Sequence, residues 1–291
     1  MAPSVTIFVT TPRSGTQWVA DAIGTAYPNE VTATHEAIGY AYAPRRFIRA
    51  YDRASEMAAI PEVRAHLDEI HALPDDHAYV EVGFPAYASI PLYVQEFGER
   101  LRIVQLVRHP ALVAASMVTH RWYDAAPRPE LEDVELTPAD AVFQRHYAAR
   151  WDRLSQYEKC LFFWSEVHLL GWEYEHRYPE VPFHRVRFRD LIEEPQTHLR
   201  ALTDFIGLPY VESIVARVDD HVDRFSRQSS TRIETGQVRR HRLAVALAER
   251  FGYEDAAVDE GAARDRYYSR WRIGPDVVRR ARHFVRSHVG S

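Results

Sequence analysis

Five short segments that resemble strands alternate with helical segments along this chain of 291 residues, and the first is an apolar run rich in β-branched residues. They lie at residues 5–9, 31–34, 77–82, 101–107 and 181–188. Segments of this length and composition are typical of buried strands. Strands joined by helices form crossover units, so we predict an α/β fold of three layers. Its central, mainly parallel sheet is flanked by helices, as in P-loop-like proteins, and carries helical insertions.

The long stretch before the last strand favours helices. Thr137 can cap a helix that has Pro138 at its first position, and two long helical segments are expected up to about residue 178. We therefore expect a single domain over residues 1–291. Its parts are a core at about 1–120 and 180–255, a helical insertion at about 137–178 and a basic C-terminal helix at about 275–288.

Charge and cysteine content exclude several classes of protein. The net charge is −5, so no global field attracts nucleic acid or an anionic membrane. Cys160 is the only cysteine, which excludes an internal disulfide and a cysteine-ligated metal cluster. The N-terminus lacks the pattern of a signal peptide, and the apolar stretch 160–172 is too short and polar to span a bilayer. We expect a cytoplasmic protein without stable membrane insertion; a homo-oligomer is left open.

The loop after the first strand is suited to binding an anion. Gly15 permits a tight turn, and the free amides of the following helix, which starts at Thr16, converge on one point. Arg13 adds a planar cation, while Ser14 and Thr16 add hydroxyl donors. The alternative is an ordinary strand–turn–helix corner with a surface arginine. We call residues 11–16 the anion-binding loop.

A second arginine follows the fourth strand. Arg108 stands at the carboxyl end of that strand, Pro110 starts a helix, and Ser116 lies about two turns into it. An arginine and a serine in this arrangement can hold one phosphate from two directions. Alternatively, Arg108 caps a sheet edge and Ser116 permits close helix packing.

Both motifs resemble those of the sulfotransferases that use 3′-phosphoadenosine-5′-phosphosulfate (PAPS), in particular soluble bacterial-type members. An ATP-type loop has a first glycine and a lysine that this loop lacks. The family's 5′-phosphosulfate loop is instead matched by Pro12, Arg13, Ser14, Gly15, Thr16 and Trp18. The Arg-x-Pro turn with a serine on the next helix, here Arg108 and Ser116, resembles the family's 3′-phosphate motif.

One weaker resemblance and one departure from the family concern the C-terminal part. Residues 187–191 resemble a family segment whose aromatic stacks on adenine, which implies Phe188, although Arg189 departs from the usual glutamate. Core packing of Phe188 is an equal alternative. Many relatives close over the nucleotide with a Gly-Asp-Trp loop, whereas residues 231–240 here carry arginines and no tryptophan. We expect one or two of Arg232, Arg239 and Arg240 to touch the 3′-phosphate, and the sequence does not choose among them.

The resemblance implies transfer of a sulfuryl group from PAPS to a hydroxyl of a small-molecule, lipid or carbohydrate acceptor, with 3′-phosphoadenosine-5′-phosphate (PAP) as product. The expected nucleotide-binding residues are Arg13, Ser14, Gly15, Thr16, Gln17, Trp18, Arg108, Ser116, Phe188, Arg232, Arg239 and Arg240. Arg13 should also stabilise the leaving phosphate. No metal is required by this scheme.

The base that takes the acceptor proton has three candidates. Relatives use a histidine or a glutamate, and Glu36 matches the place of the glutamate after the second strand in several bacterial-type members. His35 precedes it, and Glu81 ends the third strand. We rank Glu36 first, then His35, then Glu81. Glu36 could instead cap a helix, and Glu81 could pair with an arginine.

Two other functions are compatible with this fold class. The first is a P-loop phosphotransferase that uses ATP and Mg²⁺, with Glu81 as the acidic ligand, although the loop lacks the lysine. The second is a non-catalytic nucleotide-binding module, because fold does not determine activity. The acceptor cannot be read from the sequence, since its aromatic-rich segments are equally explained by core packing.

Overall fold

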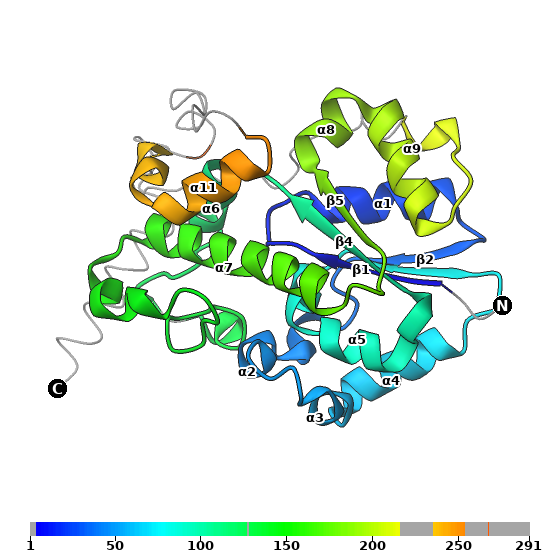
Figure 1. Ribbon diagram of the computed structural model, residues 1–291, viewed down its shortest axis with the longest axis horizontal. Coiled ribbons are helices and arrows are strands. Elements are labelled where there is room, and N and C mark those ends of the chain that lie inside the picture. The colour runs from blue at the N-terminus through cyan, green and yellow to red at the C-terminus, as the bar shows by residue number, and fades with distance from the viewer. Residues whose placement is uncertain (1–3, 127, 216–234, 254–266, 268–291) are drawn as a thin grey trace. The chain divides into compact units, whose positions relative to one another are not determined.

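A five-stranded parallel sheet forms the centre of the computed structural model, which describes residues 4–126, 128–215, 235–253 and 267. The strands are β1 (Ser4–Val9), β2 (Val31–Thr34), β3 (Ala78–Glu81), β4 (Leu101–Val107) and β5 (Phe183–Arg187). They lie in the order β2-β3-β1-β4-β5 (Figure 1). Every pairing is parallel, which confirms the predicted fold class.

The topology determines where a ligand can bind. The chain leaves β1 toward β2 on one side and leaves β4 toward β5 on the other. The loops that follow the adjacent strands β1 and β4 therefore diverge at the same edge of the sheet. In open α/β sheets, ligands bind at such a switch point, beyond the carboxyl ends of the strands. The anion-binding loop follows β1, and Arg108 follows β4.

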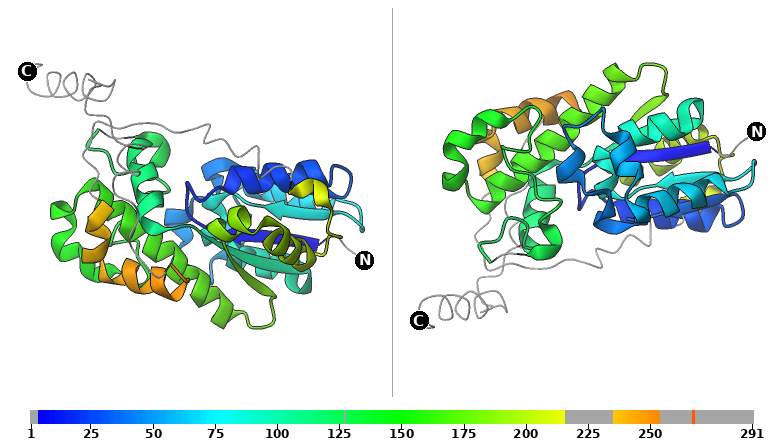
Figure 2. Two further views of the ribbon diagram at one scale, coloured as in Figure 1. Left: turned by 90° about the horizontal axis from the view of Figure 1, so that it is seen from above. Right: turned by 90° about the horizontal axis from the view of Figure 1, so that it is seen from below.

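Helices cover both faces of the sheet, as Figures 1 and 2 show. On one face lie α1 (Thr16–Ala26), α8 (Phe188–Glu193) and α9 (Pro195–Ile206); on the other lie α4 (Pro61–His71) and α5 (Ile90–Phe97). The core under α1 and α9 is continuous: Val19 and Ile23 belong to the same buried cluster as Phe8, Val104 and Leu202. Burial of these apolar side chains is the main force that holds the layers together.

The remaining elements are shorter or lie further along the chain. The α-helices are α2 (Pro44–Phe47), α3 (Ala54–Ala58), α6 (Pro110–Thr119), α7 (Gln156–Arg177) and α11 (Arg242–Arg250). The 3₁₀ helices are η1 (Gly39–Tyr42), η2 (Phe84–Ala88), η3 (Gly98–Arg100), η4 (Pro129–Leu131), η5 (Arg145–Arg153), η6 (Glu212–Ile214) and η7 (Thr235–Arg240). No helix among the described residues is long and apolar enough to cross a bilayer.

The prediction of two long helices between residues 137 and 178 is wrong in its first half. That half contains turns and the 3₁₀ helix η5, and only α7 is a long α-helix. The carboxylate of Asp140 accepts hydrogen bonds from both the amide and the hydroxyl of Thr137. The buried carboxylate of Glu166 accepts from the amides of Val142 and Phe143. The backbone amides of this segment thus donate to side-chain carboxylates, and the segment does not form an α-helix.

The chain divides into two compact units. The first contains the sheet and comprises Met1–Arg108, Leu136–Ala148 and Glu166–Val222. The second comprises His109–Glu135, Ala149–Ser165 and Asp223–Ser291. α6, η4, η7 and α11 belong to the second unit, and α7 contributes residues to both. The single domain over 1–291 stays a prediction, and the expected basic helix at about 275–288 lies outside the described residues.

Candidate functional site

The anion-binding loop has alternating backbone conformations. Arg13 has a φ of 67° and Gly15 a φ of 90°, both in the left-handed region. Such alternation turns successive amides toward one concave side, which favours an anion. The hydroxyls of Thr11 and Ser14 are 2.8 Å apart and brace the turn from within. Gly15 is the N-cap of α1 and brings no capping side chain, so the amides of the first helical turn point toward the same side.

The ring of Phe188 supports this loop. A Cβ added at Gly15 would lie 2.2 Å from Cε2 of Phe188, so only glycine permits this close approach. Phe188 is 5% exposed and belongs to the core cluster, and Trp18 meets its ring edge-on at 5.8 Å between centroids. The structure thus gives Phe188 a packing role beneath the loop. Its stacking on adenine stays a prediction.

Arg108 joins the second motif to the first. Its Nη1 atom donates a hydrogen bond to the carbonyl oxygen of Arg13 over 2.8 Å. Its guanidinium carbon also lies 5.4 Å from the centroid of the Phe188 ring, a cation–π contact. The carboxyl end of β4 is therefore connected directly to the loop after β1. The arginines of the two predicted phosphate-binding motifs are neighbours in space.

Most of the other predicted nucleotide-binding residues belong to the second unit. Ser116 is buried in α6 of the second unit, and Arg239 and Arg240 are exposed at the end of η7 in that unit. Arg232 lies outside the described residues. Gln17 is exposed on α1. The part that these residues play in nucleotide binding stays a prediction.

Two polar residues after β2 meet the loop. The hydroxyl of Thr16 lies 2.9 Å from Nε2 of His35, and the same nitrogen lies 3.6 Å from Oε1 of Glu36. Burial lowers the pKa of His35, an effect that Asp21 opposes and Arg13 reinforces. Near neutral pH the imidazole is therefore uncharged. The start of α1 and the end of β2 are held together at the edge of the sheet where the anion-binding loop lies.

Glu36 combines a strained backbone with a shifted pKa. Its φ of 59° is in the left-handed region, and its side chain is 29% exposed. Burial and then the negative charge of Glu81 raise its pKa from 4.5 to about 7, and Arg13 opposes the rise. A carboxylate with a pKa near 7 exists in both protonation states at neutral pH. This property suits a general base.

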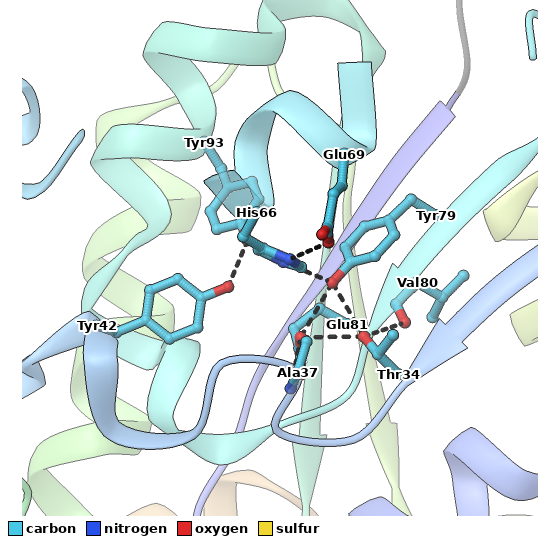
Figure 3. A network of polar contacts seen from close by, with 9 residues as sticks. All are labelled: Thr34, Ala37, Tyr42, His66, Glu69, Tyr79, Val80, Glu81 and Tyr93. Carbon is cyan, nitrogen blue, oxygen red and sulfur yellow. Dashed lines mark hydrogen bonds and ion pairs between the residues drawn. The ribbon is translucent and has the colours of Figure 1, made fainter. Parts of the chain in front are cut away.

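Glu81, by contrast, is enclosed. It is fully buried at the end of β3, and its two carboxylate oxygens accept hydrogen bonds from Thr34, Tyr79 and three backbone amides. Figure 3 shows the contacts with Thr34, Tyr79 and Ala37. A carboxylate surrounded by donors in this way is not presented to an acceptor or to a metal ion. The structure therefore favours Glu36 over Glu81 as the base.

Sequence reasoning missed the partners of Glu81. Thr34 and Tyr79 both hydrogen-bond to its Oε2 atom, and Gly83 donates its amide to Oε1. One signal was available. Tyr79 and Glu81 are two residues apart on a strand and so share a face, while Thr34 ends the neighbouring strand. Polar residues at the ends of adjacent buried strands predict a buried polar cluster.

A parallel sheet with an anion-binding loop at its switch point, together with a poised carboxylate, defines an α/β protein of the P-loop-like class. The family model of the sulfotransferase domain matches residues 3–237. The chain therefore belongs to the sulfotransferase family, whose enzymes transfer a sulfuryl group.

Solved structures similar to this chain are distant. A sulfotransferase from Alicyclobacillus acidocaldarius is 14% identical, with 88% of this chain and 98% of that chain covered and a TM-score of 0.48. The sulfotransferase domain of the Synechococcus PCC 7002 olefin synthase is 15% identical, with 86% and 94% covered and a TM-score of 0.43. Mouse sulfotransferase SULT7A1, complexed with PAP, is 17% identical, with 75% and 63% covered and a TM-score of 0.43. No curated protein matches the sequence. The family assignment rests on the domain match.

Proposed function

We propose that this enzyme transfers the sulfuryl group of PAPS to the hydroxyl of a small-molecule, lipid or carbohydrate acceptor, with Glu36 as the base. One observation carries the proposal: the anion-binding loop contacts Arg108 at Arg13 and His35 at Thr16, and Glu36 adjoins that histidine. An anion-binding loop, a second cation and a base thus occur together. The free cysteine Cys160 is consistent with a cytoplasmic enzyme.

The chemistry follows from these positions. PAPS supplies a sulfuryl group on a phosphate leaving group. As the acceptor oxygen bonds to sulfur, the carboxylate of Glu36 takes the hydroxyl proton, and the bond from sulfur to the bridging phosphate oxygen breaks. The guanidinium of Arg13 and the amides of the loop stabilise the charge that develops on that oxygen. The loop fits a phosphate because Arg13 and Gly15 turn its amides to one side.

Selective nucleotide binding tests the donor. We expect PAP to raise the melting temperature by several degrees at 100 times its Kd, equivalent to about 2.7 kcal/mol, because it binds only the folded state. ADP, which lacks the 3′-phosphate, should raise it less. Equal stabilisation by ATP, or transfer that requires ATP and Mg²⁺, would instead support a phosphotransferase.

Glu36→Gln tests the base. The amide keeps the shape of the side chain but cannot take a proton, so turnover of PAPS with a panel of phenols, sugars and sterols should fall by roughly 10²- to 10⁴-fold. PAP affinity, measured by calorimetry, should stay within about twofold. The control is Glu30→Gln, an exposed glutamate ahead of β2, which should keep full activity. Turnover near that of the unmodified enzyme in Glu36→Gln would remove Glu36 from this role.

A further inference from the structure

A buried polar network lies at the carboxyl ends of β2 and β3, and Glu81 is its centre (Figure 3). Oε1 of Glu81 accepts from the amide of Gly83 at 2.6 Å and from the amide of Glu36 at 3.1 Å. Oε2 accepts from the hydroxyls of Thr34 at 3.0 Å and Tyr79 at 3.1 Å, and from the amide of Ala37 at 3.4 Å. A buried carboxylate with five donors is fully satisfied and fixed in place.

Two of the backbone amides that donate to Glu81 come from the turn that carries Glu36. Those of Glu36 and Ala37 are consecutive, and both are aimed at the carboxylate of Glu81. This pairing holds the strand-end turn, residues 34–37, in a conformation in which Glu36 has a φ of 59°. Such a conformation costs a non-glycine residue on the order of 1 kcal/mol and persists only where its surroundings enforce it. Glu81 therefore determines the backbone conformation from which the Glu36 side chain projects.

Close approach of the two strand ends confirms how tightly this turn is held. A Cβ at Gly83 would lie 2.4 Å from Oε1 of Glu81 and 2.5 Å from the amide nitrogen of Glu36. Neither atom can easily move aside. Oε1 of Glu81 is held by hydrogen bonds, and the amide nitrogen of Glu36 belongs to the backbone. The absence of a side chain at residue 83 is thus a requirement of the contact between Glu81 and Glu36.

We propose that Glu81 is a positioning residue for Glu36: its hydrogen bonds fix the strand-end turn, and its buried carboxylate is electrostatically coupled to that of Glu36. The catalytic consequence rests on the proposed role of Glu36 in sulfuryl transfer. The electrostatic coupling between the two carboxylates does not, and it can be measured without any acceptor.

The charges around the two carboxylates support this role. Glu36 faces Arg13 of the anion-binding loop, His35 of its own turn and Glu81 of β3. Arg13 favours the charged form of Glu36 and Glu81 opposes it, in addition to the effect of burial. Burial raises the pKa of Glu81 too, and its hydrogen bonds counteract that rise. Three of its five donors are backbone amides, which can only donate, so they favour the ionised carboxylate.

The aromatic and imidazole groups around Glu81 stay neutral. Burial raises the pKa of Tyr79 and, further out, of Tyr42 and Tyr93, so these phenols are protonated throughout the working range. Burial lowers the pKa of His66, whose Nε2 lies 2.9 Å from the Tyr79 hydroxyl; Glu69, which is exposed, opposes that shift. Among the described residues, no cation therefore offsets Glu81 from within this network.

Carbon-13 NMR of the glutamate side chains tests the coupling directly. The signal of Glu36 is identified by its loss in Glu36→Gln, and its titration is then followed in the full-length protein and in Glu81→Gln. Glutamine keeps the shape of the side chain; its oxygen can face the amides of Glu36 and Gly83, and its amide group can face the two hydroxyls. We expect the midpoint of Glu36 to fall by about one pH unit, because a neighbouring negative charge has been removed.

Glu166→Gln is the matched control. Glu166 is also fully buried in the first unit, and it accepts hydrogen bonds from the amides of Val142 and Phe143. Its substitution removes a buried charge and backbone contacts of the same kind, away from Glu36. It should lower stability and leave the Glu36 titration unchanged. A midpoint of Glu36 in Glu81→Gln equal to that in Glu166→Gln would overturn the proposal.

A reciprocal measurement covers the case in which Glu81→Gln does not fold. Coupling free energies are symmetric, so removing the charge of Glu36 must shift Glu81 by the same amount. In Glu36→Gln the titration of Glu81 should move to lower pH by about one unit. An unmoved Glu81 signal would also refute the coupling. If the coupling is found but Glu36→Gln turns over normally, the proposed base fails while the inference about Glu81 stands.

Discussion

The guanidinium of Arg108 donates a hydrogen bond to the carbonyl oxygen of Arg13 over 2.8 Å, across 95 residues of sequence. This contact connects the end of β4 to the anion-binding loop after β1. It also holds Arg13 in the left-handed conformation, with a φ of 67°. Arg108 is thus both a candidate phosphate ligand and a support for the other motif, and its loss should affect both.

Binding of two nucleotides to Arg108→Ala separates these two roles. Hydrogen bonds to charged groups contribute about 1.5–3 kcal/mol, so we expect PAP affinity to fall by roughly 10- to 100-fold. ADP lacks the 3′-phosphate, and its affinity should fall only by the share that comes from support of the loop. Calorimetry with both nucleotides measures the difference. Arg102→Ala, which removes an arginine earlier on β4, is the control and should change neither affinity.

Gly15→Ala should be severely destabilising, and Phe188 is the reason. The added methyl group would lie 2.2 Å from the Phe188 ring, on a backbone with a φ of 90°. Overpacking costs about 1–3 kcal/mol and the left-handed conformation about 1–2 kcal/mol more. Urea unfolding should show a loss in the free energy of unfolding equal to the sum of these two costs.

A double-mutant cycle with Phe188→Leu checks the steric cause. The smaller side chain should recover the overpacking share of the loss in Gly15→Ala, leaving the backbone strain. If the two substitutions were strictly additive, the ring of Phe188 would not be what restricts residue 15.

The pKa of Glu36 predicts how rate and stability depend on pH. As a base it must be deprotonated, so turnover should fall about tenfold per pH unit below a midpoint of about 7. Stability has the opposite dependence. The folded-state pKa of about 7 lies above the ordinary 4.5, so the stabilising contribution of Glu36 is complete below pH 4.5 and is lost as the pH rises through 7.

Glu36→Gln should therefore be more stable than the unmodified protein at pH 8, but not at pH 4. Urea unfolding of both proteins at the two pH values measures this difference in stability. A substitution that destabilises equally at both would show that the Glu36 carboxylate is not held at a raised pKa.

Gly83→Ala should disrupt the contact between Glu81 and the strand-end turn. The methyl group has no room beside Oε1 of Glu81, so we expect a loss of about 1–3 kcal/mol in the free energy of unfolding and a large loss of turnover. Gly24→Ala is the matched control. Gly24 lies within α1, and its Cβ would meet only the Cβ of Ala33 on β2 at an ordinary 3.5 Å, so alanine should stabilise the helix by about 0.5–1 kcal/mol. Similar losses in both variants would contradict the argument.

Local pattern was a good guide to the elements of the sheet. β4 has the predicted bounds, 101–107, because the apolar composition of a buried strand is a local signal. Pattern failed at Thr137, where a cap followed by proline is not followed by an α-helix. There the carboxylate of Glu166, distant in sequence, takes up backbone amides of residues 142 and 143.

The sequence by itself determined where the strands lie along the chain, the glycine at residue 15 that permits a left-handed turn and the cation at residue 13, because each depends on residues within a few positions. Only the tertiary structure decided which polar groups meet. It joined Arg108 to Arg13, placed Phe188 beneath Gly15, and enclosed Glu81 while leaving Glu36 partly exposed. Two glutamates that look alike in the sequence thus acquire different chemistry, since burial and neighbouring charges are properties of the folded chain.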